Sequence, residues 1–161
     1  AGAGMLGTIE FNSSTLYRYA NVAVHELYRQ LKDEEATINT VQLFIEAFVK
    51  SLPTGKVNTF ANQTIPQMVL LTLRLDRPVN LVSAFEKPIR SREGYLDKSI
   101  ENLFEEYKKV EKFVDKPVFA AFVSTEDLDF ATDEIKEEES IGQLLEVFRG
   151  KVEENLAEDG E

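Results

Sequence analysis

The sequence contains no cysteine and only one histidine, His25. The first absence excludes disulfide bonds, thiolate nucleophiles, zinc ribbons and iron–sulfur clusters, and it agrees with a reducing compartment. A Ser-His-Asp hydrolase would have to use His25, but no serine stands in a nucleophile-elbow motif. No apolar run approaches the ~18 residues that span a bilayer, and residues 1–6 lack the features of a signal peptide. We therefore expect a cytoplasmic protein that is not an enzyme.

Recognisable metal and phosphate motifs are also missing. Gly55-Lys56 resembles the end of a P-loop, but the upstream glycine is absent and Asn58-Thr59 comes too late in the chain. The acidic residues between 127 and 134 lack the glycine and the terminal glutamate of an EF-hand. We expect a turn at the first position, a solvated acidic loop at the second, and neither a cofactor nor a metal site.

What the sequence does have is an uneven distribution of charge. Its 161 residues include 18 Lys and Arg against 29 Asp and Glu, a net charge of −11, and 43% are hydrophobic. Residues 1–100 carry a net charge of +1, whereas residues 101–161 carry −12. The length and composition suit one globular domain. Because the acidic third repels phosphate, nucleic-acid contacts are to be sought in the first hundred residues.

The pattern of apolar residues predicts a domain of mixed α and β structure. β-branched and aromatic residues over 8–24 predict one bulged strand or two strands. Helical spacing predicts helices over 26–32, 40–52, 98–114 and 141–156, and apolar runs predict strands over 67–75 and 118–123. The acidic segment 124–140 is expected to be weakly structured. This order of elements is typical of an α/β or α+β domain in which helices cover a sheet.

Local signals predict where two of these helices begin. Asn39 with Gln42, and Ser140 with Gln143, have the spacing of capping boxes. Gly150 lies inside the last helix, where glycine costs about 1 kcal/mol relative to alanine, so we expect fraying or a bend there.

Basic and aromatic residues in the first hundred positions offer a nucleic-acid interface. Lys87, Arg90 and Arg92 form a basic stretch that follows Phe85 and contains one acid, Glu86, and such a loop can grip phosphates. The alternative is a solvated turn between a strand and a helix.

Two tyrosines give a second candidate. Tyr17 and Tyr19 share one face of the predicted strand and can stack on bases, as aromatic residues do on RNA-binding sheets. The alternative is that the pair belongs to a core beneath a helix.

Four segments agree in order and spacing with a known family. They are Gly2 to Val22, Thr59-Phe60-Ala61 with Pro66-Gln67-Met68-Val69, Ala84-Phe85-Glu86-Lys87, and Gly94-Tyr95-Leu96 with Ser99-Ile100. These segments resemble the C-terminal half of the CasC family, the backbone subunit of the type I-E CRISPR surveillance complex, Cascade. The resemblance covers about residues 2–104 and is weak beyond Val123.

The resemblance implies an α+β fold: an incomplete ferredoxin-like or RRM-like palm, with helices packed on a mostly antiparallel sheet, plus a C-terminal helix. Residues 1–124 would be the C-terminal part of the palm, and residues 125–161 an acidic linker and the C-terminal helix. The first palm strand and helix, the fingers and the thumb of the family lie upstream of the matching segment. The chain would therefore be a fragment of a longer subunit.

The resemblance also implies a function. Family members bind guide RNA and polymerise along it, which presents the guide for recognition of target DNA in antiviral defence. The implied partners are guide RNA, target DNA, other Cascade subunits and further copies of the subunit, and the isolated fragment is expected to associate with itself. The backbone subunit is not the nuclease of its system.

Site residues transfer to three groups of positions in this sequence. The first group matches a basic loop that faces nucleic acid and consists of Lys87, Arg90 and Arg92. The second matches a polar loop near the guide and consists of Lys56, Asn58 and Thr59. The third matches the palm-strand motif, where a structural role is an equal alternative, and consists of Tyr17, Arg18 and Tyr19.

A function from another class is an acidic protein-interaction module that binds partners through helix 141–156 and has no nucleic-acid role. A hydrolase built around His25 is a third hypothesis.

Overall fold

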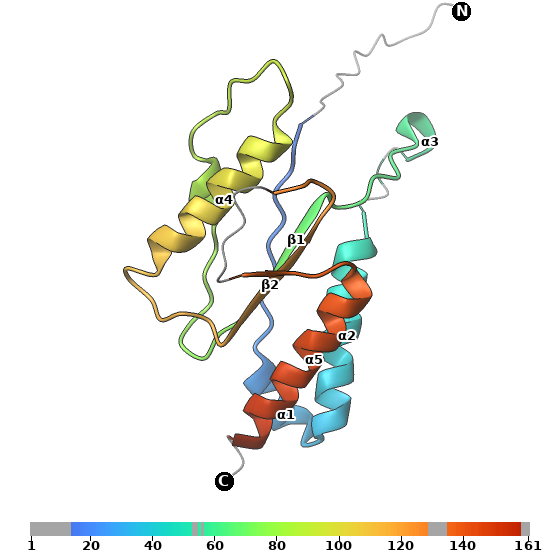
Figure 1. The fold of residues 1–161 in the computed structure, drawn as a ribbon. Coiled ribbons are helices and arrows are strands. Elements are labelled where there is room, and N and C mark those ends of the chain that lie inside the picture. Colours follow the sequence, from blue (N-terminus) through green and yellow to red (C-terminus); the bar gives the residue numbers. More distant parts are fainter. Residues whose placement is uncertain (1–13, 53–54, 56, 129–134, 159–161) are drawn as a thin grey trace, which may run out of the picture.

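The computed structural model describes residues 14–52, 55, 57–128 and 135–158, and these form five α-helices, one 3-10 helix and three strands (Figure 1). The elements in chain order are α1 (Val24–Leu31), α2 (Glu34–Lys50), α3 (Val57–Phe60), β1 (Met68–Leu73), η1 (Val82–Phe85), α4 (Leu96–Val110), β2 (Phe119–Ser124), β3 (Lys136–Glu137) and α5 (Ile141–Glu158).

The three strands form one sheet in the order β1-β2-β3. β1 and β2 are antiparallel over their whole lengths, with Met68 opposite Ser124 and Leu73 opposite Phe119. β3 is short and runs parallel to β2, where Ala121 lies opposite Lys136. The apolar run of β2 is typical of an interior strand, and β2 does lie between the other two.

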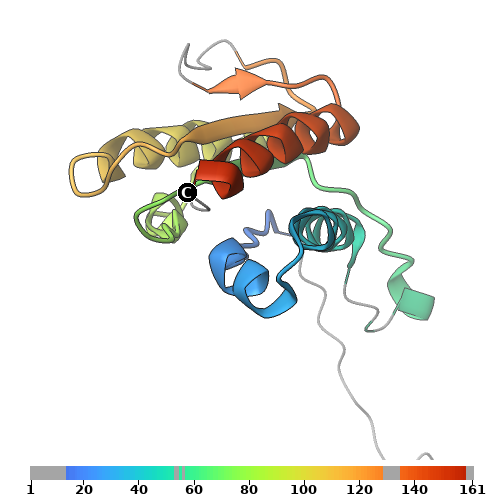
Figure 2. The same ribbon diagram turned by 90° about the horizontal axis from the view of Figure 1, so that it is seen from below.

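Helices cover both faces of this sheet. Side chains alternate between the two faces along each strand, so each face presents apolar side chains to a helix. Val69, Leu71 and Ala121 face α2 and α5, whereas Leu70 and Phe122 face α4. Figure 1 shows α4 on one side of β1 and β2, and α2 and α5 on the other. In Figure 2, α1 and α2 lie together on the side of the molecule away from β3. The expected α+β fold, with helices on a mostly antiparallel sheet, is confirmed.

The two faces carry separate cores. The first, which we call the α5 core, joins the sheet to α2 and α5; its buried members are Ile38, Val41, Phe119, Ala121, Leu144, Phe148, Val152 and Leu156. The second, the α4 core, joins the sheet to α4; its buried members are Leu81, Ile100, Leu103, Phe104, Tyr107, Phe122 and Ile135. Phe122 on β2 has no exposed surface and Leu144 on α5 is 1% exposed, so both cores are closely packed.

The strand predicted over 8–24 is wrong for the residues that the structure describes. Residues 14–23 adopt no regular structure and α1 begins at Val24, while residues 8–13 lie outside the described part of the chain. Leu16 is 81% exposed, and within the described part of the chain residues 14–22 form no backbone–backbone hydrogen bond. β-branched and aromatic residues favour a strand only where another strand supplies hydrogen bonds, and this segment has no such partner among the described residues.

The capping box predicted at Asn39 and Gln42 is also wrong, because α2 begins at Glu34. Asp33 is the N-cap, and its side chain accepts a hydrogen bond from Ala36 N–H at 2.8 Å. Glu34 and Glu35 then place negative charge in the first turn, which the helix dipole favours.

The remaining elements agree with the sequence more closely. α1, α4, α5, β1 and β2 fall at the positions predicted for them, with ends that differ by a few residues. The Ser140 hydroxyl accepts from Gln143 N–H at 3.3 Å, which confirms the second cap, although the Gln143 side chain returns to Glu139 N–H. α5 continues through Gly150 to Glu158 without the predicted fraying. No helix among the described residues has the length and apolar character required to cross a membrane.

Candidate nucleic-acid interface

The predicted basic residues lie on the loop that connects η1 to α4. Figure 1 shows this loop projecting at the upper end of the molecule, beyond the N-terminal end of α4. Lys87, Arg90 and Arg92 are all exposed. None of the three takes part in a hydrogen bond or ion pair with the residues that the structure describes. The loop therefore presents three cationic groups to solvent with their donors unoccupied.

Most other basic side chains among the described residues form an ion pair with a nearby acidic side chain. Lys50 pairs with Glu46, Lys98 with Glu101, and Lys109 with Glu105, each within one turn of a helix. Such exposed pairs contribute little to stability, but they cancel the local positive potential. Lys87, Arg90 and Arg92 form no such pair with the described residues, although the loop also contains Glu86 and Glu93.

The base of the loop is fixed by Tyr17. Its hydroxyl donates to Asn80 Oδ1 at 3.1 Å and accepts from Leu81 N–H at 3.3 Å, while its ring lies 5.0 Å from that of Phe85. Burial raises the pKa of the Tyr17 phenol, although the Leu81 hydrogen bond acts in the opposite direction. These contacts hold Tyr17 against η1 and the two residues that precede it.

Asn80 was not singled out by the sequence. Its Oδ1 also accepts from Val82 N–H at 3.0 Å, a local Asx-type bond, so it connects Tyr17 to the first turn of η1. At the far end of the loop Gly94 has φ of +120°, a conformation that side chains rarely adopt, and the chain turns there into α4. Local sequence offers an Asx-turn signal at Asn80, but no signal for a partner 63 residues away.

Arg18 contacts the end of α2, whereas Tyr19 is partly exposed. Arg18 donates to the carbonyl of Ser51 at 2.7 Å and its guanidinium lies 4.3 Å from the centre of the Phe48 ring. These contacts tie the N-terminal segment to the C-terminal end of α2. Tyr19 is 40% exposed, and the shared strand face predicted for Tyr17 and Tyr19 does not form because the segment is not a strand.

The predicted polar loop forms part of α3. Asn58 and Thr59 lie on this four-residue helix and are exposed, whereas Lys56 lies outside the described residues. Figure 1 places α3 and the η1–α4 loop toward the same end of the molecule, on opposite sides of β1. Among the described residues, no hydrogen bond or ion pair joins Asn58 or Thr59 to the η1–α4 loop.

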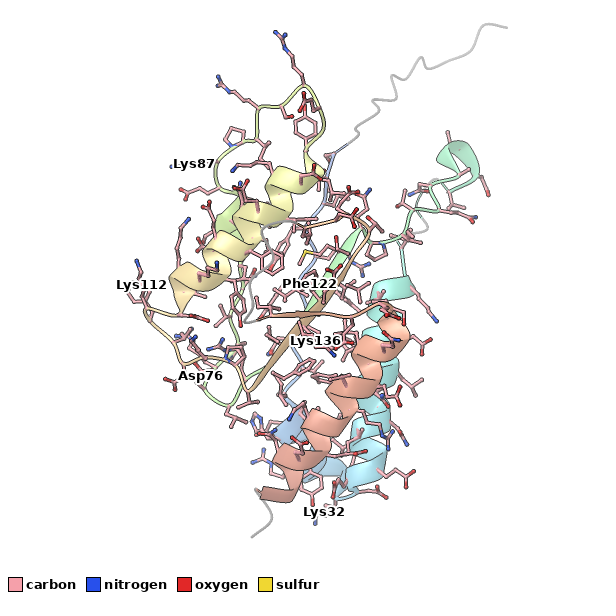
Figure 3. The ribbon with its side chains drawn as sticks, in the orientation of Figure 1. Lys32, Asp76, Lys87, Lys112, Phe122 and Lys136 are labelled. Carbon is pink, nitrogen blue, oxygen red and sulfur yellow. The ribbon has the colours of Figure 1, made fainter. Side chains whose placement is uncertain are left out.

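A second surface near the other end of α4 contains cations but is not basic. Arg77 and Lys112 line an open hollow together with Asp76, Glu111 and Asp115. Figure 3 shows Asp76 and Lys112 at the lower end of α4, away from Lys87. Because acids outnumber bases in this hollow, it offers a phosphate no net attraction.

The remaining candidates are His25 and the acidic segment 127–134, of which Asp129, Asp133 and Glu134 lie outside the described residues. His25 lies on α1 with its side chain 76% exposed, and its Nε2 is 3.6 Å from Glu26 Oε1. Within the described ranges, no group of three or more His, Asp or Glu side chains is placed to hold a metal ion.

Comparisons with known proteins found a matching family and solved structures of similar fold. Residues 1–147 match the family described as CT1975-like protein. A solved structure titled "CRISPR RNA-guided surveillance complex" superimposes with a TM-score of 0.75 at 22% identity, covering 81% of this chain and 50% of that one. Another, titled "CRISPR RNA-guided surveillance complex, pre-nicking", gives 0.76 at 22% identity and covers 81% and 39%. The chain thus spans half or less of these structures' chains. No match to a curated protein sequence was found.

Proposed function

The chain belongs to the CT1975-like family of CRISPR-associated proteins, and from this premise we propose that it is part of the guide-binding backbone subunit of a CRISPR surveillance complex of the type I-E kind. In this proposal the subunit binds guide RNA, polymerises along it with further copies and other Cascade subunits, and presents the guide to target DNA. It acts in the cytoplasm as a binding component, without a catalytic step and without a cofactor.

The observation that carries the proposal is the η1–α4 loop. Three exposed cations, Lys87, Arg90 and Arg92, stand on a projecting loop with no acidic partner in the described part of the chain. A guanidinium without a protein partner offers up to five donors to phosphate oxygens, and phosphate contacts need no base sequence. This suits a subunit that must hold guides of any sequence. The likeness in fold to chains titled as RNA-guided surveillance complexes supports the same function.

The test is the double variant Arg90→Ala/Arg92→Ala in the full subunit, assembled into its complex. We expect weaker binding of guide RNA and a shallower dependence of affinity on salt. Each lost phosphate contact lowers the slope of log K against log salt by roughly 0.7 for a single strand. Filter binding at several salt concentrations measures both quantities.

The matched control is Lys108→Ala/Lys112→Ala, which removes the same charge. Lys108 is exposed on α4 and Lys112 follows its C-terminal end, at the opposite end of the helix from the loop (Figure 3). We expect this control to leave the salt slope unchanged. If both double variants behave alike, or if neither alters binding, the loop is only a solvated turn and the proposal fails.

The competing interaction module would bind through the apolar stripe of α5, which is not exposed in the described part of the chain. The apolar stripe of α5, which includes Leu144, Phe148 and Val152, is buried in the α5 core. A partner would have to unfold that core to bind the same residues, so we do not propose this function.

A further inference from the structure

Tyr95 is an exposed aromatic residue at the junction of the η1–α4 loop and α4. It is the N-cap of α4 and is 51% exposed. Among the described residues, its ring has no aromatic partner and its hydroxyl forms no hydrogen bond. Aromatic rings stabilise a fold chiefly when they are buried, so packing within the described chain does not account for a large ring at this position.

The other exposed aromatic residues lie in different surroundings. They are Tyr19, Tyr28, Phe44 and Phe113. The Phe44 ring lies 6.1 Å from that of Phe48, and Phe113 lines the acid-rich hollow at the other end of α4. Within the described ranges, Tyr95 is the exposed aromatic residue that adjoins three basic side chains without ion pairs.

The backbone of Tyr95 is fixed by the first turn of α4. Ser99 N–H donates to the Tyr95 carbonyl at 3.0 Å, and the Ser99 hydroxyl donates to the same oxygen at 2.6 Å. Ser99 is buried, and Leu96 packs on the α4 core. The ring is therefore presented by an ordered helix end, which lowers the entropy lost when it binds a ligand.

The basic residues of the loop lie within reach of the same ligand. Arg92 stands three residues before Tyr95. Three residues of chain span at most about 11 Å, so one or two nucleotides can bring a phosphate to Arg92 and a base to the Tyr95 ring.

The charge of the loop alone is modest. Residues 86–95 carry three basic side chains against Glu86 and Glu93, a net charge of +1. This charge attracts phosphate weakly, so firm binding needs a contribution that does not depend on charge. Stacking of a base on an aromatic ring is such a contribution, and it accompanies a basic groove in proteins that bind single strands.

We propose that Tyr95 is a base-stacking residue, whose ring packs on a base of a single-stranded RNA while Arg90 and Arg92 contact the phosphates. This inference rests on the proposed function, because the guide is the strand concerned. Every base has a π-face, so stacking needs no base sequence and suits guides of any sequence. The ring covers only the face of the base, which leaves the Watson–Crick edge open for target DNA.

Fluorescence anisotropy of a labelled single-stranded RNA of mixed sequence, mixed with the 161-residue chain at several low salt concentrations, tests the proposal. Tyr95→Leu keeps an apolar side chain but removes the ring. We expect it to lower the affinity roughly 5-fold or more and to leave the slope of log K against log salt unchanged. A strand of equal length without bases keeps the phosphates, and we expect it to bind Tyr95→Leu and the parent equally.

Two further variants complete the experiment. Phe113→Leu is the matched control, because it removes a ring that is 88% exposed at the other end of α4, and we expect no change in affinity. Tyr95→Trp keeps a stacking ring and introduces the only tryptophan of the chain. We expect it to bind RNA at least as well as the parent, with fluorescence that RNA quenches and the strand without bases does not.

Four results would overturn the proposal. They are equal RNA affinities of Tyr95→Leu and the parent, an equal loss for the strand without bases, an equal loss in Phe113→Leu, and binding of RNA that leaves the fluorescence of Tyr95→Trp unchanged. Absence of RNA binding by the parent chain also overturns it. The Arg90→Ala/Arg92→Ala variant of the assembled complex still decides the proposed function in each case, so the two failures are distinguishable.

Discussion

Arg149 on α5 donates a hydrogen bond to Asn39 on α2, with its Nη1 atom 2.8 Å from Asn39 Oδ1, although 110 residues separate them. The same nitrogen lies 3.1 Å from Gln42 Oε1, and the Nε atom of Arg149 lies 2.7 Å from Glu153 Oε1. Gln42 in turn donates to the carbonyl of Leu145 at 3.1 Å. These bonds fasten α2 to α5 beside the α5 core.

Replacing Arg149 by alanine should therefore destabilise the fold. The substitution leaves the Asn39 and Gln42 oxygens without their donor, and we expect a loss of about 1–2 kcal/mol in the free energy of unfolding. Lys151→Ala is the control, because Lys151 pairs only with Glu154 at the surface and should cost less than about 0.5 kcal/mol. Urea denaturation measures both, and equal losses would show that the interhelical bonds add nothing.

The same contact explains why the start predicted for α2 was wrong. Asn39 and Gln42 have the spacing of a capping box, yet both lie inside the helix and serve a neighbour distant in sequence. Asp33 is the N-cap instead, because its carboxylate accepts a hydrogen bond from a backbone N–H and two glutamates follow it in the first turn. Local spacing identifies residues able to cap a helix, but it does not show that a tertiary partner already engages them.

The strongly periodic elements were predictable for a different reason. In α4 and α5 the apolar stripe is the core-facing side, so Leu103 and Leu144 are buried where helical spacing places them. Residues 14–23 were not predictable because a strand needs a partner, which no local pattern reveals. The exposed cations of the η1–α4 loop were found by composition, while the anchor of that loop, Tyr17 with Asn80, required the fold.

Tyr17→Phe separates a structural role from a contact with nucleic acid. The variant keeps the ring beside Phe85 but leaves Leu81 N–H without its acceptor and removes one of the two donors to Asn80 Oδ1, so we expect a loss of about 1 kcal/mol in stability. Affinity for RNA per folded subunit should not change. Tyr19→Phe, at an exposed ring, should alter neither quantity. Weaker RNA binding by Tyr17→Phe at unchanged stability would contradict the structural role.

Asp76 gives the stability of the protein a dependence on acid. Arg74 donates to both carboxylate oxygens, with Nε–Oδ1 and Nη2–Oδ2 distances of 2.9 Å, and chiefly this bonding lowers the pKa of Asp76 from 3.8 to about 2. Because the folded pKa lies below the unfolded one, the stabilising effect is complete above about pH 4 and is lost as the pH falls through about 2. Asp76→Asn should be less stable than the parent at about pH 5, and the difference should shrink toward about pH 2.

Thermal unfolding at a series of pH values measures that difference. Asp127→Asn is the control, because Asp127 is exposed and forms no hydrogen bond with the described residues. We expect its stability curve to run parallel to that of the parent. If Asp76→Asn also runs parallel, the Arg74 pair contributes nothing to folding.

Leu144→Ala decides between α5 as part of the core and α5 as a docking helix. Leu144 is 1% exposed and packs in the α5 core with Phe148, so truncation removes buried contacts and leaves a cavity. We expect a loss of about 2–5 kcal/mol in the free energy of unfolding. Val147→Ala, at a position 37% exposed on the same helix, should cost far less. A docking helix behaves in the opposite way: Leu144→Ala would leave the isolated chain as stable as its parent and weaken only the capture of a partner.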